Sequence, residues 1–241
     1  MLVKFLVCGV QKGGTSALDQ YLRMHPDISM ASTKEVHFFD NESQFVNAAP
    51  DYNRYHSFFD PSKNNLLGES TPIYAYWQPS MKRIWQYNKD MKLILVLRNP
   101  ISRAYSHWKM ERIRGSEGLP FWDAITQERE RCFQALPYQH RVFSYVDRGF
   151  YSEQIRRMRR FFPDENILVL NNDNLRRFPD ITVNQVFNFL GARELKAIEP
   201  IEAHSRRYEV PMSDIERAYL QHIYSGEFEW IRSEFSWDFS N

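Results

Sequence analysis

Cysteine is scarce in this sequence, which has only Cys8 and Cys132 among its 241 residues. Two cysteines so far apart make neither the disulfide framework of a small secreted domain nor the spacing of a metal site. A reducing compartment is the expected setting, because disulfides form mainly in oxidising ones. We therefore expect a cytoplasmic protein.

Long hydrophobic runs are also missing. No apolar stretch approaches the roughly 18 to 20 residues that cross a bilayer as a helix, so we expect no membrane span. The apolar start at residues 2–10 is interrupted by Lys4 and runs directly into a glycine turn. That pattern is typical of a strand rather than of a signal peptide.

Neither sign of charge is in excess: 31 Lys and Arg stand against 30 Asp and Glu, a formal net charge of +1. Domains that bind nucleic acid are usually strongly basic, so we expect no nucleic-acid partner. The hydrophobic share of 43% and the aromatic share of 15% are ample for a core. The sequence has no internal repeat and no linker-like segment, which favours a single domain over residues 1–241.

Short strands and helices are predicted to alternate along the chain. Three apolar runs have the composition of buried strands, at residues 3–10, 91–97 and 166–170. Periodicity and capping residues predict helices at residues 15–24, 100–113, 151–162 and 181–190. This alternation predicts an α/β fold, a single P-loop-like domain with a central parallel β-sheet flanked by helices.

The loop between the first strand and the first helix reads GVQKGGTSAL, residues 9–18. A helix N-terminus offers unpaired amides and the positive end of the helix dipole, glycine permits close approach, and lysine and hydroxyls add charge and donors. The pattern predicts a phosphate-binding loop, and the alternative is a tight turn with capping residues. The predicted ligand-binding residues are Lys12, Gly13, Gly14, Thr15 and Ser16.

This loop differs from that of a P-loop NTPase, in which lysine directly follows the last glycine. Here Lys12 precedes the glycine pair. Nucleotide kinases and NTPases also need an acidic residue for Mg²⁺, usually at the end of a neighbouring buried strand. Arg98 occupies that place after residues 91–97. We therefore predict an anion site without a metal, and a P-loop kinase or NTPase is the alternative.

Three segments together resemble the sulfotransferases that use 3′-phosphoadenosine 5′-phosphosulfate (PAPS). GVQKGGTSAL resembles the family's loop for the 5′-phosphosulfate, and LRNPISRAYSHW, residues 97–108, resembles its 3′-phosphate motif. KEVHFFD, residues 34–40, is similar to the segment with the catalytic carboxylate in heparan-sulfate-type enzymes and bacterial relatives. The resemblance implies metal-independent transfer of a sulfonate from PAPS to a hydroxyl of a small molecule or carbohydrate, leaving 3′-phosphoadenosine 5′-phosphate (PAP).

The resemblance also implies residues for the nucleotide. Arg98 and Ser106 match the positions that bind the 3′-phosphate. The segment AHSRRYEVP, residues 203–211, lies where the family closes a basic loop over the nucleotide, so Arg206 and Arg207 are added as binding residues. A protein that binds the nucleotide without turnover is a further alternative.

For catalysis, the resemblance places the general base at Glu35. If its segment is extended, His37 shares a side with Glu35 and either holds the acceptor or acts as the base itself. Asp40 is expected to orient one of them, and Lys12 to stabilise the departing phosphate. Without the resemblance, the same segment could hold a solvated charge pair and a packed aromatic cluster.

One position departs from the glycan-type pattern: Ser70, in GESTPIY, residues 68–74, stands where a lysine is common. One positive charge near the sulfonate would thus be missing. A net charge of +1 also provides no global field for a long polyanion. The sequence leaves the acceptor and the oligomeric state open.

Overall fold

The computed structural model describes residues 2–46, 50–60, 66–201 and 211–240. The chain forms two compact units. The first comprises Met1–Leu97 and Arg157–Ala203, and the second comprises Arg98–Arg156 and His204–Asn241. No helix within the described ranges is both long and apolar enough to cross a membrane.

The first unit contains a five-stranded sheet in the order β2-β3-β1-β4-β5, and all of its strand pairs are parallel. The strands are β1 (Phe5–Gly9), β2 (Ile28–Met30), β3 (Leu66–Ser70), β4 (Lys92–Leu97) and β5 (Ile167–Asn171). Phe5 lies opposite Gly68 on one side of β1 and opposite Lys92 on the other. The prediction of an α/β fold with a central parallel sheet is thus confirmed.

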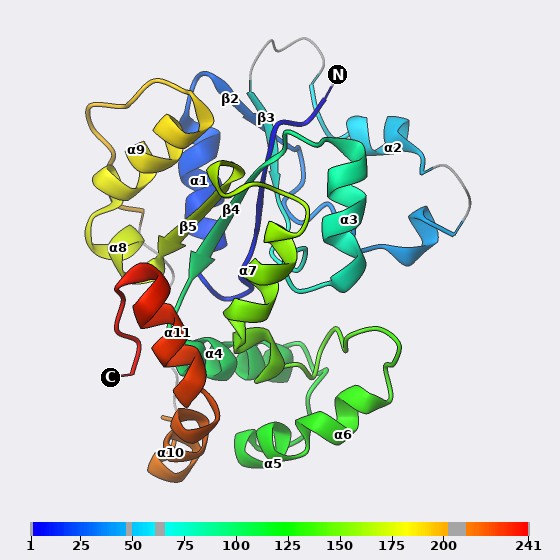
Figure 1. The fold of residues 1–241 in the computed structure, drawn as a ribbon, viewed down its shortest axis with the longest axis vertical. Helices are drawn as coiled ribbons and strands as arrows, with labels where there is room; N and C mark the ends of the chain where they lie inside the picture. The colour runs from blue at the N-terminus through cyan, green and yellow to red at the C-terminus, as the bar shows by residue number, and fades with distance from the viewer. Residues whose placement is uncertain (1, 47–49, 61–65, 202–210, 241) are drawn as a thin grey trace. The chain divides into compact units, whose positions relative to one another are not determined.

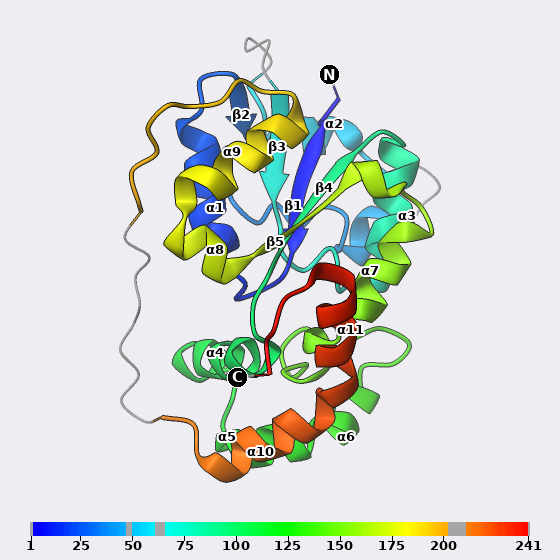
Figure 2. The same cartoon turned by 60° about the vertical axis from the view of Figure 1, so that its left-hand side comes forward.

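Helices cover both faces of this sheet (Figures 1 and 2). One face carries α1 (Thr15–Met24), α8 (Asn172–Arg177) and α9 (Pro179–Leu190), and the other carries α2 (Tyr52–His56) and α3 (Gln78–Tyr87). Short 3-10 turns at Glu42–Gln44 and Asp164–Asn166 complete the unit.

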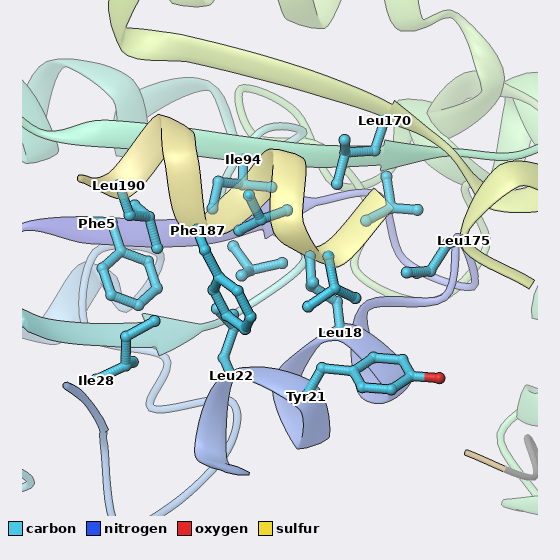
Figure 3. Packing of buried hydrophobic residues seen from close by; sticks show 14 of the residues in the cluster. Phe5, Leu18, Tyr21, Leu22, Ile28, Ile94, Leu170, Leu175, Phe187 and Leu190 are labelled. Carbon is cyan, nitrogen blue, oxygen red and sulfur yellow. The ribbon is translucent and has the colours of Figure 1, made fainter. Parts of the chain in front are cut away.

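The core beneath α1 and α9 follows from the alternation of side chains along β1 and β4. Phe5 and Ile94 point to this face, where they meet Leu18 and Leu22 of α1 and Phe187 of α9 (Figure 3). All five side chains are fully buried. Burying one such side chain contributes about 1.5 to 3 kcal/mol, so this packing fixes α1 and the loop before it against β1.

The second unit is helical. Its helices are α4 (Pro100–Ile113), α5 (Phe121–Thr126), α6 (Glu128–Phe133), α10 (Asp214–Ile223) and α11 (Ser225–Phe235), with a 3-10 turn at Asp147–Gly149 and the start of α7 (Tyr151–Arg159). Buried polar side chains hold the turn before α7, because Arg103 donates to the Tyr145 carbonyl and the Glu128 carboxyl group accepts the amides of Val146 and Asp147. Burial raises the pKa of Glu128 to about 8.

Candidate active site

The carboxyl ends of the parallel strands meet at one edge of the sheet, and the glycine loop follows the central strand β1 there. From β1 the chain leads to β2 and β3 on one side and later to β4 and β5 on the other. Open α/β sheets bind ligands at the point where the strand order changes direction in this way. The candidate site is therefore built from loops at this edge.

The glycine loop requires both of its central glycines. A Cβ atom at Gly13 would lie 2.2 Å from the Val96 carbonyl oxygen, which leaves no room for a side chain. Gly14 has φ of +107°, in the left-handed region that favours glycine. The Asn172 side chain donates to the Gly13 carbonyl at 2.7 Å. The neighbouring strand β4 and the residue after β5 thus fix the path of the loop.

The first turn of α1 offers backbone donors to an anion. Gly14 is the N-cap, no side chain caps the helix, and no acidic residue lies in the first turn. The amides of Ala17 and Leu18 donate to the Gly14 carbonyl, and the amides before them are those that a helix leaves without an intrahelical partner. One turn and the start of α1 bring together the five predicted loop residues Lys12, Gly13, Gly14, Thr15 and Ser16.

The predicted catalytic residues form a chain of charges beside β3. Lys34 Nζ lies 2.7 Å from Glu35 Oε1, and His37 Nε2 lies 3.7 Å from Glu35 Oε2. The second distance is that of an ion pair and exceeds a hydrogen bond. His37 Nδ1 lies 2.9 Å from Oδ2 of Asp40, whose side chain is fully buried. Asp40 is thus placed to orient the His37 ring.

The backbone of this segment is not the extended strand assumed for Glu35 and His37. Their φ angles are 62° and 54°, in the left-handed region, and residues 35–38 form no strand. The Glu35 amide donates to the Ser70 carbonyl at the end of β3, and the Phe38 amide donates to the Tyr74 hydroxyl. Single hydrogen bonds, and not the ladder of a strand, thus hold this segment. The left-handed conformations of Glu35 and His37 bring their side chains together.

The groups around Glu35 and His37 shift the pKa values of these two side chains in opposite directions. The His37 ring is the main cause that lowers the pKa of Glu35 to about 2, with Lys34 contributing. Asp40 and then Glu35 raise the pKa of His37 to about 9. At neutral pH the segment therefore holds a carboxylate at Glu35 and an imidazolium at His37. Glu35 can accept a proton in this state, and His37 cannot.

Glu69 lies in β3 directly before Ser70, at the border of the candidate site, and the sequence did not single it out. This carboxylate is fully buried in β3 and accepts hydrogen bonds from Tyr55 Oη at 2.9 Å, Tyr74 Oη at 3.0 Å and Thr71 Oγ1 at 2.8 Å. Burial raises its pKa to about 7 despite these donors. In the sequence, only the presence of a glutamate within β3 could have pointed to this cluster, because the fold and not the sequence spacing brings Tyr55 and Tyr74 to Glu69.

Ser70, the position that departs from the glycan-type pattern, ends β3. Its side chain is 1% exposed, and its Oγ has no hydrogen-bond partner within the described part of the chain. Its carbonyl accepts the Glu35 amide at 2.9 Å. Ser70 is therefore a direct backbone neighbour of the predicted base.

The predicted 3′-phosphate residues belong to the second unit. Arg98 follows β4 directly and is half-buried, and its carbonyl accepts the Tyr151 hydroxyl at 2.7 Å. The Asn99 side chain caps α4 by accepting the Ser102 amide at 3.0 Å. Ser106 lies two turns into α4 and is 4% exposed. Arg206 and Arg207 lie outside the described residues.

A profile of the family described as "Sulfotransferase domain" matches residues 3–211. Heparan sulfate glucosamine 3-O-sulfotransferase 6 of Mus musculus is 31% identical over an alignment of 201 residues, which covers 79% of this chain and 52% of that protein. The Homo sapiens protein of the same name is 32% identical over 197 residues, with the same two shares. This chain therefore spans about half the length of these curated relatives.

Solved structures show the same fold. A sulfotransferase from Alicyclobacillus acidocaldarius is 25% identical and has a TM-score of 0.83, covering 99% of this chain and 97% of that one. A sulfotransferase domain from the curacin biosynthetic pathway is 16% identical with a TM-score of 0.55, covering 80% and 75% of the two chains. The second likeness is one of fold alone.

Proposed function

The chain belongs to the sulfotransferase domain family, and from this premise we propose that it transfers the sulfonate group of PAPS to a hydroxyl of a small-molecule or carbohydrate acceptor. The observation that carries the proposal is the position of the Glu35 carboxylate between Lys34 and His37, with its backbone amide hydrogen-bonded to the end of β3. β3 is the direct neighbour of β1, which leads into the glycine loop. A base and an anion-binding loop thus lie at one edge of the sheet.

In this reaction the acceptor oxygen attacks sulfur, a new oxygen–sulfur bond forms, and the bond from sulfur to the 5′-phosphate oxygen breaks. The hydroxyl proton passes to the Glu35 carboxylate, which is unprotonated at neutral pH. A low pKa makes Glu35 a weak base, but the hydroxyl becomes more acidic as it attacks, so a positioned carboxylate suffices. The His37 cation then orients the carboxylate rather than serving as the base.

The departing phosphate is the second charge that the protein must stabilise. Lys12 and the amides at the start of α1 are the groups we assign to it, because the first turn of α1 contains no acidic residue. We assign the 3′-phosphate to Arg98 and Ser106, with Arg206 and Arg207 as further nucleotide contacts. The transfer is proposed to need no metal.

The deciding experiment is a binding titration with PAP and, separately, with ATP and Mg²⁺. We expect PAP to bind at least about tenfold more tightly, a difference of about 1.4 kcal/mol. A preference for ATP, or an affinity that does not depend on the 3′-phosphate, would replace the proposal with the kinase or NTPase alternative. Turnover of PAPS with a hydroxyl acceptor separates the enzyme from a protein that only binds nucleotide.

Arg98→Ala tests the 3′-phosphate assignment. A lost charge-assisted contact is worth about 1.5 to 3 kcal/mol, so the affinity for PAP should fall by about 10- to 150-fold. Arg114→Ala is the matched control, since Arg98 lies just before α4, whereas Arg114 directly follows the other end of this helix and pairs with Glu111 at 3.2 Å. Equal affinities in both variants would remove Arg98 from the site.

Of the two acceptor classes, small molecules and carbohydrates, we propose carbohydrates as the first to test, because the curated relatives are named for transfer to heparan sulfate glucosamine. Neutral glycans and heparan sulfate should be compared as acceptors, since Ser70 supplies no positive charge beside Glu35. We also propose that residues 1–241 act as one functional domain in the cytoplasm. The free thiols of Cys8 and Cys132 support that setting.

A further inference from the structure

We propose that Glu69, acting through the Tyr74 hydroxyl, is a positioning residue that holds the segment of Glu35 and His37 in its working conformation. The inference rests on the proposed function, in which Glu35 accepts the proton. Glu69 itself is fully buried, so it does not contact the acceptor. Its influence on the reaction would run through hydrogen bonds alone.

The Tyr74 hydroxyl links Glu69 to the segment that contains Glu35 and His37, and it uses its full hydrogen-bonding capacity to do so. It donates its proton to Glu69 Oε1 at 3.0 Å, and its oxygen accepts the Phe38 amide at 3.0 Å and the Phe39 amide at 3.4 Å. A hydroxyl has one proton and two lone pairs, so no capacity remains. The two amides can only donate, so the hydroxyl turns its lone pairs toward them and directs its proton to Glu69 Oε1.

The catalytic segment needs such support because its backbone is strained. Glu35 and His37 both have positive φ, and left-handed conformations of residues other than glycine persist only where the surroundings enforce them. The Glu35 amide is held by the Ser70 carbonyl, and the Phe38 amide directly after His37 is held by Tyr74. These two bonds bracket the strained residues.

Further anchors hold only the far end of the segment. Arg83 Nη1 donates to the Phe39 carbonyl at 2.9 Å, and Ser80 Oγ donates to the same oxygen at 3.2 Å. Both lie beyond Phe38 along the chain. Asp40 contacts the His37 ring, but among the described residues it is the Tyr74 hydroxyl that holds the backbone amide directly after His37, and Glu69 orients this hydroxyl.

Tyr55 provides a matched control within the same cluster. Its hydroxyl donates to the same Glu69 Oε1 at 2.9 Å, and its side chain is as fully buried as that of Tyr74. Its ring stacks on Phe38 with centroids 4.8 Å apart, a contact that phenylalanine preserves. Tyr55→Phe and Tyr74→Phe thus each remove one buried bond to Glu69, but only the second releases the backbone beside His37.

The experiment measures kcat, KM, PAP affinity and the His37 imidazole pKa by NMR in both variants. For Tyr74→Phe we expect kcat to fall about tenfold or more, because small misplacements of a catalytic group are costly. PAP affinity should stay within about twofold, and the His37 pKa should move from about 9 toward its ordinary 6.5. Tyr55→Phe should keep kcat and the His37 pKa near those of the wild type.

Equal loss of kcat and an equal His37 pKa shift in both variants would overturn the proposal, since a general weakening of the cluster would then explain them. Wild-type kcat and His37 pKa in Tyr74→Phe would also overturn it. Should Tyr74→Phe fail to fold, Glu69→Met, which leaves the Tyr74 hydroxyl without its oxygen acceptor, is measured instead against the same expectations. Should wild-type protein turn over no PAPS, the proposed function fails, whereas the His37 titration still tests the positioning.

Discussion

Glu35 and Glu69 are two glutamates in the same unit whose surroundings give them opposite properties. The Glu35 side chain is 39% exposed and lies between Lys34 and His37, and its pKa falls to about 2. Glu69 is 0% exposed and accepts three hydroxyl hydrogen bonds, yet its pKa rises to about 7. The neutral hydroxyl donors around Glu69 do not offset the rise in pKa that burial causes. At the half-exposed Glu35, the neighbouring cations His37 and Lys34 stabilise the ionised carboxylate. The difference assigns the proton transfer to Glu35 and a structural role to Glu69.

The largest expected effect separates the two glutamates by activity. Glu35→Gln should lower kcat by about a hundredfold or more, because the amide cannot accept the hydroxyl proton. PAP affinity should be nearly unchanged. Steady-state kinetics and a PAP titration measure the two quantities. Glu153→Gln is the control, since Glu153 is an exposed glutamate that pairs with Arg156 at the same distance of 2.7 Å as Glu35 with Lys34.

Activity that survived Glu35→Gln would move the base to another group. His37 would then have to lose its proton first, and kcat would rise with pH toward 9. A rate that stays flat from pH 6 to 8 in the wild type instead fits Glu35, which is already ionised there.

Glu69→Gln sharpens the comparison through stability. Burial raises the folded-state pKa of Glu69 from 4.5 to about 7, so protonation stabilises the fold below pH 4.5 and this contribution is lost as pH rises through 7. The shift corresponds to about 3 kcal/mol. The free energy of unfolding of wild type minus that of Glu69→Gln should therefore decrease by about this amount from pH 4.5 to 8. Urea unfolding at both pH values measures it, and a constant difference would contradict the buried titration.

The sequence predicted the fold well where strands are apolar and helices have clear start or stop residues. The helix over residues 15–24 begins and ends as predicted, and Gly191 ends α9 with φ of 76°. The helix predicted to end at residue 162 ends at Arg159. β2 and β3 were not predicted, because β2 has three residues and β3 contains Gly68, Glu69 and Ser70. A buried strand with two polar residues lacks the usual pattern.

The site was predictable only as far as local sequence fixes it. The turn from Lys12 to Ser16 follows from its glycines, whose spacing is local. The cluster around Glu69 depends on Tyr55 and Tyr74, which no sequence spacing relates to it. The left-handed backbone at Glu35 was also missed, since the Ser70 carbonyl that holds its amide lies in a strand far along the chain.

His37 links the two carboxylates and should show a smaller dependence of stability on pH. Its folded-state pKa is raised from 6.5 to about 9, so its protonation stabilises the fold below pH 6.5 and the contribution is lost as pH rises through 9. Its side chain is 45% exposed, and solvent screening limits the effect to about 1 kcal/mol. His37→Gln should therefore lose less stability than the wild type between pH 6.5 and 9.5 in urea unfolding. An equal loss in both proteins would contradict the assigned shift.

Lys34→Met is expected to have the smallest effect, because Lys34 and Glu35 are 25% and 39% exposed. Exposed ion pairs contribute about 0.2 to 1 kcal/mol, so kcat should change by less than about fivefold. Losing Lys34 raises the pKa of Glu35 only part of the way, since His37 is the larger cause and remains. Any effect should shrink as salt increases, because screening weakens exposed pairs. Lys34→Arg keeps the charge and should match the wild type. If Lys34→Met lowered kcat as much as Glu35→Gln, the lysine would itself take part in the transfer, and the half-exposed site would depend on two charges rather than one.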